Sequence, residues 1–193
     1  NDKNFIDNLL KNNKITKKDF IVGIAPGAAE SAKSRMWPKE NYSELTNRLL
    51  NKKEKIKIIF VGNEEEKELI NEIINKIKEK SKAINLGGKI TLRQLFYLTE
   101  KCSLFISNDA GPMHIAAAQN VKTIGLFGPN LPLRFKPLNK KSISIYKGGI
   151  CKYSPCINVH KGQVPDCLFQ KNSDDYQKCR KNIKVGDVLG YIK

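Results

Sequence analysis

One segment of the chain combines a carboxylate, a histidine and small residues in a pattern suited to anion binding. Residues 107–118 read Ser-Asn-Asp-Ala-Gly-Pro-Met-His-Ile-Ala-Ala-Ala. Asn108 or Asp109 can cap a helix there, and Pro112 suits its first turn, where an amide proton has no helical partner. The free N–H groups and the dipole of such a helix start favour an anion such as a diphosphate. Asp109 would supply a hydroxyl acceptor and His114 a ring donor; the alternative is a well-capped helix with a surface histidine.

A second loop, residues 26–38, reads Pro-Gly-Ala-Ala-Glu-Ser-Ala-Lys-Ser-Arg-Met-Trp-Pro. Its small residues allow the backbone to curl around phosphate oxygens, which Lys33 or Arg35 can neutralise. The spacing matches neither a P-loop nor the dinucleotide-binding glycine fingerprint, so ATP hydrolysis and hydride transfer lose support. Trp37 is either a packing anchor or a platform for base stacking, and we favour the packing anchor.

A third loop, residues 125–134, reads Gly-Leu-Phe-Gly-Pro-Asn-Leu-Pro-Leu-Arg and follows a buried apolar run. Backbone amides near Asn130 can add to the same anion site. The alternative, that residues 125–134 are a simple surface turn, is equally well supported.

The elements that must position these loops alternate along the chain. Short apolar runs without helical spacing indicate strands covered on both faces, and their alternation with helical patterns demands crossover connections. We therefore predict an α/β fold with a doubly wound parallel sheet, Rossmann-like, in which the loops after the strands face one cleft. The expected strands are 20–25, 56–61, 83–86, 102–107 and 123–127, and the expected helices are 41–50, 64–80, 91–101 and 113–119.

The two ends of the chain differ from this pattern. Residues 1–19 are Lys/Asn-rich around a small apolar set at helical spacing and predict a lead-in helix or linker. Residues 20–193 form the main domain, which after about residue 128 becomes turn-rich and ends in a short helix near 185–192.

Composition narrows the class of protein. The chain has 193 residues, 40% of them hydrophobic and 28% charged, which is typical of one globular domain or a tight pair and makes disorder unlikely. No window approaches the roughly 18 consecutive apolar residues of a membrane span, and the start lacks the apolar core of a secretory signal. These features favour a soluble intracellular protein.

The net charge of +16 comes from 30 Lys and 5 Arg against 19 acidic residues. It is either compositional drift or attraction to an anionic partner, such as a membrane surface, nucleic acid or phosphorylated substrate. The sequence shows no recognition helix and no pattern of base-stacking aromatic residues, so a nucleic-acid-binding module is disfavoured.

Five cysteines, an odd number, argue against a secreted disulfide framework. The last four cluster around His160 with gaps of 4, 10 and 11 residues, without the short Cys-x-x-Cys pair usual in zinc sites. Three interpretations of these cysteines stay open: a metal site, a disulfide or redox pair, and ordinary loop cysteines. The last of these is favoured. The five are Cys102, Cys151, Cys156, Cys167 and Cys179.

Together the three loops carry a family resemblance. Pro-Gly-Ala followed by a basic residue and Trp-Pro, then Asn-Asp-Ala-Gly-Pro-Met-His-Ile-Ala-Ala-Ala, then Gly-Leu-Phe-Gly-Pro, resemble glycosyltransferase family 9, the lipopolysaccharide heptosyltransferases, from about Phe20 onward. The resemblance implies a GT-B enzyme with two Rossmann-like halves, of which this chain matches only the carboxyl-terminal, donor-binding half. The amino-terminal half, with the acceptor site and general base, would be absent, leaving no catalytic residue here.

The resemblance also implies roles for individual residues. Asp109 would hold the donor sugar hydroxyls, and His114 would lie near the diphosphate with two backbone amides. Arg35 stands where the family usually has Lys, and Lys33 lies two positions earlier, so one of them would contact phosphate. Glu66 would meet the ribose. The remaining implied donor contacts are Ala28 and Ala29 beside phosphate, Ile90 at the adenine, and the amides of Ala110 and Gly111.

The implied function is transfer of a heptose from ADP-heptose to a lipopolysaccharide core acceptor, inverting and without a metal or other cofactor. This chain alone would bind the nucleotide sugar and transfer nothing. Its basic surface would suit a cytoplasmic, peripheral position at the inner membrane. The alternatives are another two-lobed nucleotide-sugar enzyme, such as a UDP-sugar transferase or an epimerase, and a nucleic-acid-binding module.

Overall fold

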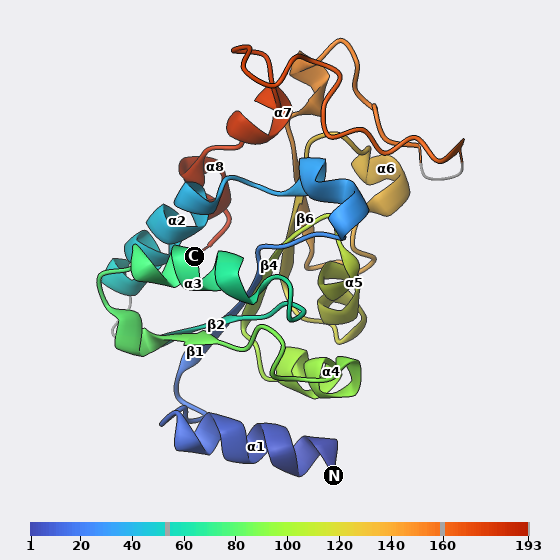
Figure 1. Ribbon diagram of the computed structural model, residues 1–193. Helices are drawn as coiled ribbons and strands as arrows, with labels where there is room; N and C mark the ends of the chain where they lie inside the picture. Colours follow the sequence, from blue (N-terminus) through green and yellow to red (C-terminus); the bar gives the residue numbers. More distant parts are fainter. Residues whose placement is uncertain (53–54, 159–160, 193) are drawn as a thin grey trace.

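The computed structural model describes residues 1–52, 55–158 and 161–192. Its centre is one sheet of six parallel strands in the order β3-β2-β1-β4-β5-β6, with helices on both faces (Figure 1). The prediction of a doubly wound parallel sheet is confirmed. The strands are β1 Phe20–Ala25, β2 Ile56–Phe60, β3 Ala83–Asn85, β4 Leu104–Asn108, β5 Thr123–Phe127 and β6 Ile143–Tyr146.

The helices connect successive strands or flank the sheet at its ends. They are α1 Asp2–Asn12, α2 Lys39–Lys52, α3 Lys67–Asn75, α4 Leu92–Glu100, α5 Gly111–Ala118, α6 Pro132–Phe135, α7 Lys178–Lys181 and α8 Val185–Leu189. Within the described part of the chain, 3-10 turns occur at Glu30–Arg35, Lys80–Lys82 and Gly148–Ile150. No helix among the described residues combines the length and the apolar character needed to cross a bilayer.

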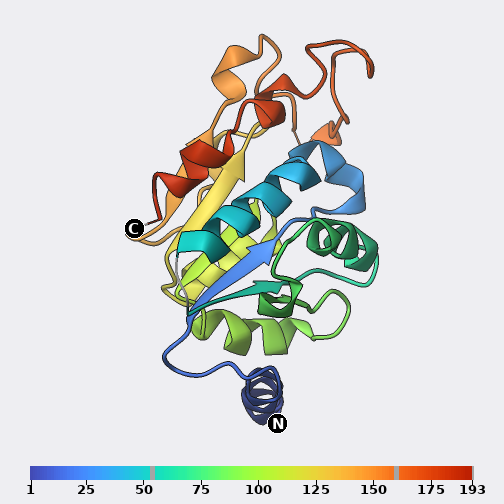
Figure 2. The ribbon, with the colours of Figure 1, turned by 90° about the vertical axis from the view of Figure 1, so that its left-hand side faces the viewer.

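Each face of the sheet has its own apolar cluster, which explains why the strands read as unbroken apolar runs. Helices α2, α3 and α8 cover one face, and α1, α4 and α5 cover the other (Figures 1 and 2). Along β1 the side chains alternate between the two clusters: Val22 and Ile24 join the first, and Ile21 and Ala25 the second.

Helix α1 packs on the body of the domain. Ile6 is fully buried and Leu10 nearly so, in the same cluster as Leu95 and Leu98 of α4. Asn1 caps the helix by accepting a hydrogen bond from the amide of Lys3. Residues 1–19, expected to be a lead-in helix or a linker, thus contain an 11-residue helix.

The expected elements differ from the structure mainly at their ends. Helix α3 occupies only the middle of the expected range 64–80, because the chain turns after Lys76 and forms a 3-10 turn at Lys80–Lys82. Strand β4 begins two residues later than expected, since Cys102 still closes the turn after α4 through a hydrogen bond to Thr99. Strand β6 and helices α6 and α7 were not predicted, because four-residue elements are too short to show a period.

Candidate functional site

A cavity of about 310 Å³ lies at the carboxyl edge of the sheet, between the loops that follow β1, β2, β3 and β4. The parallel order of these neighbouring strands brings four segments far apart in sequence to one place. Six of the ten residues predicted to bind a donor line this cavity: Ala28, Ala29, Glu66, Ile90, Ala110 and Gly111. The other four are Lys33, Arg35, Asp109 and His114.

The wall formed by the loop after β1 is made of small residues. Gly27 is buried against the carboxylate of Glu66, and a Cβ at Gly27 would lie 1.8 Å from Oε1 of Glu66. Only a residue without a side chain permits that approach. Ala28 and Ala29 extend the same wall and leave its backbone accessible from the cavity.

Glu66 is fixed by a reciprocal pair of hydrogen bonds. The amide of Asn63 donates to Oε2 of Glu66 (2.9 Å), and the amide of Glu66 donates to Oδ1 of Asn63 (2.9 Å). Burial raises the pKa of Glu66 above its usual value. Oε2 is therefore engaged by the loop, whereas Oε1 faces Gly27 at the cavity wall, where a ligand hydroxyl can donate to it.

The opposite end of the cavity is apolar. Ile90, Leu92 and Leu95 line it, and Leu92 has a relative exposure of 67%. Thr91 and Gln94 form a capping box that starts α4 here and so places Leu92 in the first turn, at the rim. Leu92 and Leu95 were not among the predicted site residues, although the Thr-x-x-Gln spacing marks this helix start in the sequence.

The amino terminus of α5 forms another part of the lining, through Ala110, Gly111 and Pro112. Gly111 is exposed, with no atom within 4 Å of the position of a Cβ. The predicted helix cap is wrong: the helix follows Ala110, and no side chain of the described residues caps it. Asp109 and Asn108 lie one and two residues before the cap position and have other partners. Pro112 occupies the first turn, as predicted.

Asp109 and Arg35 lie beside the cavity in contact with each other. Asp109 is buried, and its Oδ2 accepts a hydrogen bond from Nδ2 of Asn130. Nε of Arg35 lies 3.7 Å from the same Oδ2, and Nη1 donates to the Asp109 carbonyl (3.4 Å). Arg35 is thus the basic residue of its loop that is held next to the carboxylate. Lys33 and His114 are exposed, and neither is among the residues lining the cavity.

The third predicted loop contributes less than expected. Gly128 faces the side chain of Arg180, since a Cβ there would lie 2.5 Å from Cδ of Arg180. Among the described residues that line the cavity, none comes from residues 125–134, so the expected amide contribution near Asn130 is not seen. The connection to the site is instead the side chain of Asn130 on Asp109.

Asn108 joins the loops after β1 and β4 from inside the protein. Its Nδ2 donates to the carbonyls of Pro26 (2.7 Å) and Gly27 (3.0 Å). Its Oδ1 accepts from the amide of Trp37 (3.0 Å) and the hydroxyl of Tyr42 (3.0 Å). Asn108 therefore fixes the wall of the cavity without lining it.

Trp37 is confirmed as a packing anchor. It is almost fully buried, its ring packs edge-on against Tyr42, and its Nε1 donates to the carbonyl of Ile183 (2.8 Å). The ring is therefore unavailable for stacking on a ligand.

Arg180, fully buried, was not predicted to matter. Nη1 donates to the carbonyl of Leu126 (2.9 Å), and Nη2 donates to Oδ1 of Asn108. Burial lowers the pKa of Arg180 to about 10, which still leaves it charged at neutral pH. No spacing in the sequence distinguishes this arginine, because it lies in the turn-rich region.

Four of the five cysteines converge on one small cavity of about 20 Å³, which Ser34 also lines. All five thiols are free, and burial raises the pKa of Cys156 to about 11. Within residues 1–52, 55–158 and 161–192, no three His, Cys, Asp or Glu side chains are arranged to hold a metal ion. His160, considered with the cysteines, lies outside the described residues. The four cysteines that line the small cavity are Cys151, Cys156, Cys167 and Cys179.

Known proteins resemble the chain over nearly all of its length. It is 29% identical over 187 residues to the lipooligosaccharide heptosyltransferase 2 of Campylobacter jejuni, covering 96% of this chain and 52% of that protein. The structure of Escherichia coli ADP-heptose LPS heptosyltransferase II superposes with a TM-score of 0.73 at 25% identity, over 98% of this chain and 49% of the other. A family 9 glycosyltransferase from Veillonella parvula gives a TM-score of 0.76 at 20% identity, over 98% of this chain and 50% of the other.

The chain therefore spans about half the length of these relatives. The model of glycosyltransferase family 9 (heptosyltransferase) matches residues 4–161. This match starts within α1, earlier than the expected beginning near Phe20, and ends before the carboxyl terminus. Since it covers most of the chain, the protein belongs to glycosyltransferase family 9.

Proposed function

We propose that this chain is the donor-binding half of a heptosyltransferase, taking ADP-heptose as the nucleotide sugar and serving transfer to a lipopolysaccharide core acceptor. The observation that carries the proposal is the cavity at the carboxyl ends of β1 to β4, where six residues expected from the sequence converge. Solved relatives support the donor, since E. coli heptosyltransferase WaaC is described with ADP and TibC with ADP-D-beta-D-heptose.

The lining suits the parts of such a donor. The apolar end at Ile90, Leu92 and Leu95 fits a flat adenine ring, and Oε1 of Glu66 is positioned to accept a ribose hydroxyl. The small wall and the amino terminus of α5 then face the diphosphate, where amides and the helix dipole favour negative charge. Asp109 and Arg35 lie next along the rim, beside the place for the sugar and the diphosphate.

The chemistry we propose is inverting transfer, in which negative charge builds on the departing ADP. Arg35 and the α5 amides stabilise that charge, so the leaving group needs no metal ion. The relative TibC is described as iron-containing. Among the described residues, no three His, Cys, Asp or Glu side chains are placed to hold a metal ion. We place the acceptor site and the general base in the half of the relatives that this chain does not match.

Calorimetry with ADP tests the donor site directly. We expect saturable binding that Asp109→Ala leaves largely intact for ADP but weakens for ADP-heptose, because Asp109 would contact the sugar. Glu66→Ala should weaken both ligands. The absence of heat at millimolar ADP, together with no effect of either variant, would refute the proposal.

A second two-lobed enzyme class shares the fold. UDP-GlcNAc 2-epimerase from Methanocaldococcus jannaschii superposes with a TM-score of 0.52 at 19% identity, which supports the fold alone. Competition between ADP and UDP separates the two functions: displacement of ADP by equimolar UDP would favour a UDP-sugar enzyme. The same proposal includes a peripheral position of the protein on the cytoplasmic side of the inner membrane.

A further inference from the structure

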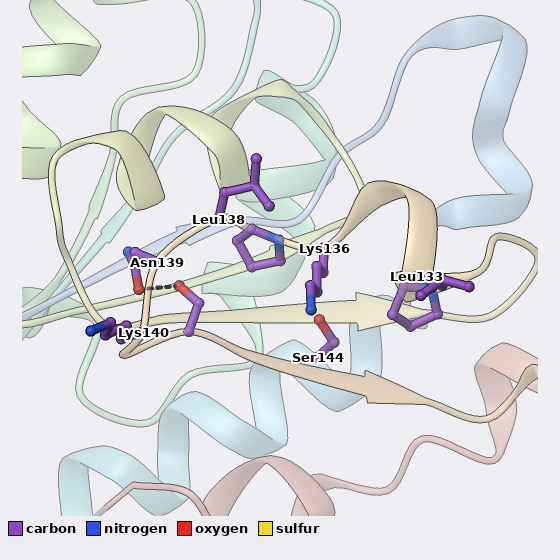
Figure 3. A pocket seen from close by; sticks show the side chains of 9 residues that line it. Leu133, Lys136, Leu138, Asn139, Lys140 and Ser144 are labelled. Carbon is purple, nitrogen blue, oxygen red and sulfur yellow. Dashed lines mark hydrogen bonds between the residues drawn. The ribbon is translucent and has the colours of Figure 1, made fainter.

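Another surface cavity lies away from the donor pocket and has a different character. It measures about 660 Å³ and is formed by the connection between β5 and β6 (Figure 3). Leu133 and Leu138 border it, each with a relative exposure of 86%, and Lys136 lies between them. Lys140 completes what we call the leucine–lysine face, defined by Leu133, Lys136, Leu138 and Lys140. It shares no lining residue with the donor pocket.

The two leucines are presented by an anchored segment. Leu133 lies on the one-turn helix α6, and Leu138 lies in the loop after it, next to buried Pro137. The following residue, Asn139, donates from Nδ2 to the carbonyls of Ala117 (2.9 Å) and Val121 (3.0 Å), which ties the loop to the end of α5. Both leucines therefore stay exposed because the backbone around them is held by hydrogen bonds, at the usual cost of leaving apolar surface in water.

The charged side chains in the sequence segment that contains this face are all positive. Residues 110–165 contain eight Lys or Arg and no Asp or Glu, whereas the other 137 residues hold 27 basic and 19 acidic side chains. This segment of 56 residues thus supplies half of the net charge of +16. Among the ion pairs of the described residues, none includes Arg134, Lys136, Lys140 or Lys141.

We propose that the leucine–lysine face docks on an anionic membrane surface. Lys side chains attract acidic headgroups, while exposed leucines between them can insert at the boundary of headgroups and acyl chains. Nucleic acid matches the charge but offers nothing apolar for Leu133 and Leu138. A neutral protein surface matches the leucines but leaves the uniform positive charge without a partner. A membrane is the one of these surfaces that satisfies both features.

The position of this face is compatible with donor binding. The donor pocket opens at the carboxyl ends of β1 to β4, and the leucine–lysine face lies over β5 and β6 beside α5. Docking here would leave the donor pocket accessible. The inference does not depend on the identity of the donor, because vesicle binding can be measured without any nucleotide.

Cosedimentation of the 193-residue chain with vesicles tests the proposal. The probes are vesicles of phosphatidylcholine alone and vesicles containing one part phosphatidylglycerol to two parts phosphatidylcholine, at low and high salt. The variants are Leu133→Ser/Leu138→Ser and Lys136→Gln/Lys140→Gln. The matched controls are Lys17→Gln/Lys18→Gln, two exposed lysines near β1, and Leu168→Ser, an exposed leucine elsewhere. Thermal unfolding of each variant verifies that it folds.

We expect binding to the anionic vesicles that salt weakens. The paired leucine variant should reduce the partition coefficient about tenfold. The paired lysine variant should reduce it by about 25-fold, at about fivefold for each Lys. The controls should change it by less than about twofold.

Equal losses in the Lys17/Lys18 control would show that charge alone binds, and an unchanged leucine variant would show that nothing inserts; either result overturns the proposal. A loss of self-association instead of vesicle binding would identify a second copy as the partner and would also overturn it. Unchanged ADP binding in these variants keeps this result separate from the donor-site proposal.

Discussion

Arg180 and Asn108 lie 72 positions apart in the sequence and form a hydrogen bond inside the protein, from Nη2 of the guanidinium to Oδ1 of the amide. Because Nδ2 of the same asparagine holds the carbonyls of Pro26 and Gly27, the arginine is linked to the wall of the donor pocket through one side chain. The carboxyl-terminal segment thereby supports the site, although none of its described residues lines the cavity.

We predict that Arg180→Met lowers the free energy of unfolding by about 1–3 kcal/mol. Methionine keeps much of the buried stem, but the Leu126 carbonyl loses its donor and Asn108 loses one of three. Urea unfolding followed by circular dichroism measures the change. Lys181→Met, at an exposed neighbour, should stay within about 0.5 kcal/mol. Equal stability of both variants would show that the buried hydrogen bonds contribute little.

We predict that Gly27→Ala destabilises the protein and weakens ADP binding, because its Cβ would collide with the Glu66 carboxylate. The cost of such overpacking is about 1–3 kcal/mol. The double variant Gly27→Ala/Glu66→Ala removes the collision and should regain part of the stability lost by Gly27→Ala. A double-mutant cycle from urea unfolding measures this coupling. Strict additivity of the two single changes would contradict the close contact.

The sequence predicted the centre of the sheet well because strands β1, β2, β4 and β5 are buried on both faces. Unbroken apolar runs and helical periods determine order and crossovers, and they place the loops after β1 to β4 at one edge. Six of the ten candidate residues lie in these loops and line one pocket, and of these six Glu66 and Ile90 were named through the family resemblance alone. The roles assigned to all ten stay predictions, including those of Lys33, Arg35, Asp109 and His114.

What the sequence could not predict depends on long-range packing. Asn108 looks like a helix cap in the sequence, yet donors from Trp37, Tyr42 and Arg180 surround it inside the protein. Those partners come from a loop, a helix and the turn-rich end of the chain, so no local spacing reveals them. The same holds for the four cysteines, which only the folded chain brings to one cavity.

We predict that the stability advantage of Glu66→Gln over the wild type grows as the pH rises. Burial raises the pKa of Glu66, so the folded state binds this proton more tightly than the unfolded state. The stability that the protonated carboxyl contributes is present at low pH and is lost as the pH rises through the raised folded pKa. Glutamine keeps an acceptor for the Asn63 amide and has no charge to desolvate. Urea unfolding of both proteins at about pH 4 and pH 8 measures the difference.

A constant difference in stability between wild type and Glu66→Gln across this pH range would contradict a raised pKa. A larger advantage at low pH would mean that the carboxylate is stabilised in its charged form. Asp187→Asn serves as the matched control, since Asp187 pairs with Lys147 at the surface, away from the pocket. The change in the free energy of unfolding caused by Asp187→Asn should come from the loss of that ion pair.

We predict that two cysteines resist alkylation in the native protein. Burial raises the pKa of Cys102 to about 12 and that of Cys156 to about 11, so at about pH 8 very little thiolate is present at either site. Iodoacetamide should modify Cys156 at least about a hundredfold more slowly than a free cysteine, and Cys102 more slowly still because its sulfur is buried beside Gly23. Peptide mass spectrometry over a time course measures each site, with the urea-unfolded protein as the control in which all five should react alike. Rapid native modification of Cys156 would show that the small cavity it shares with three other thiols opens to solvent.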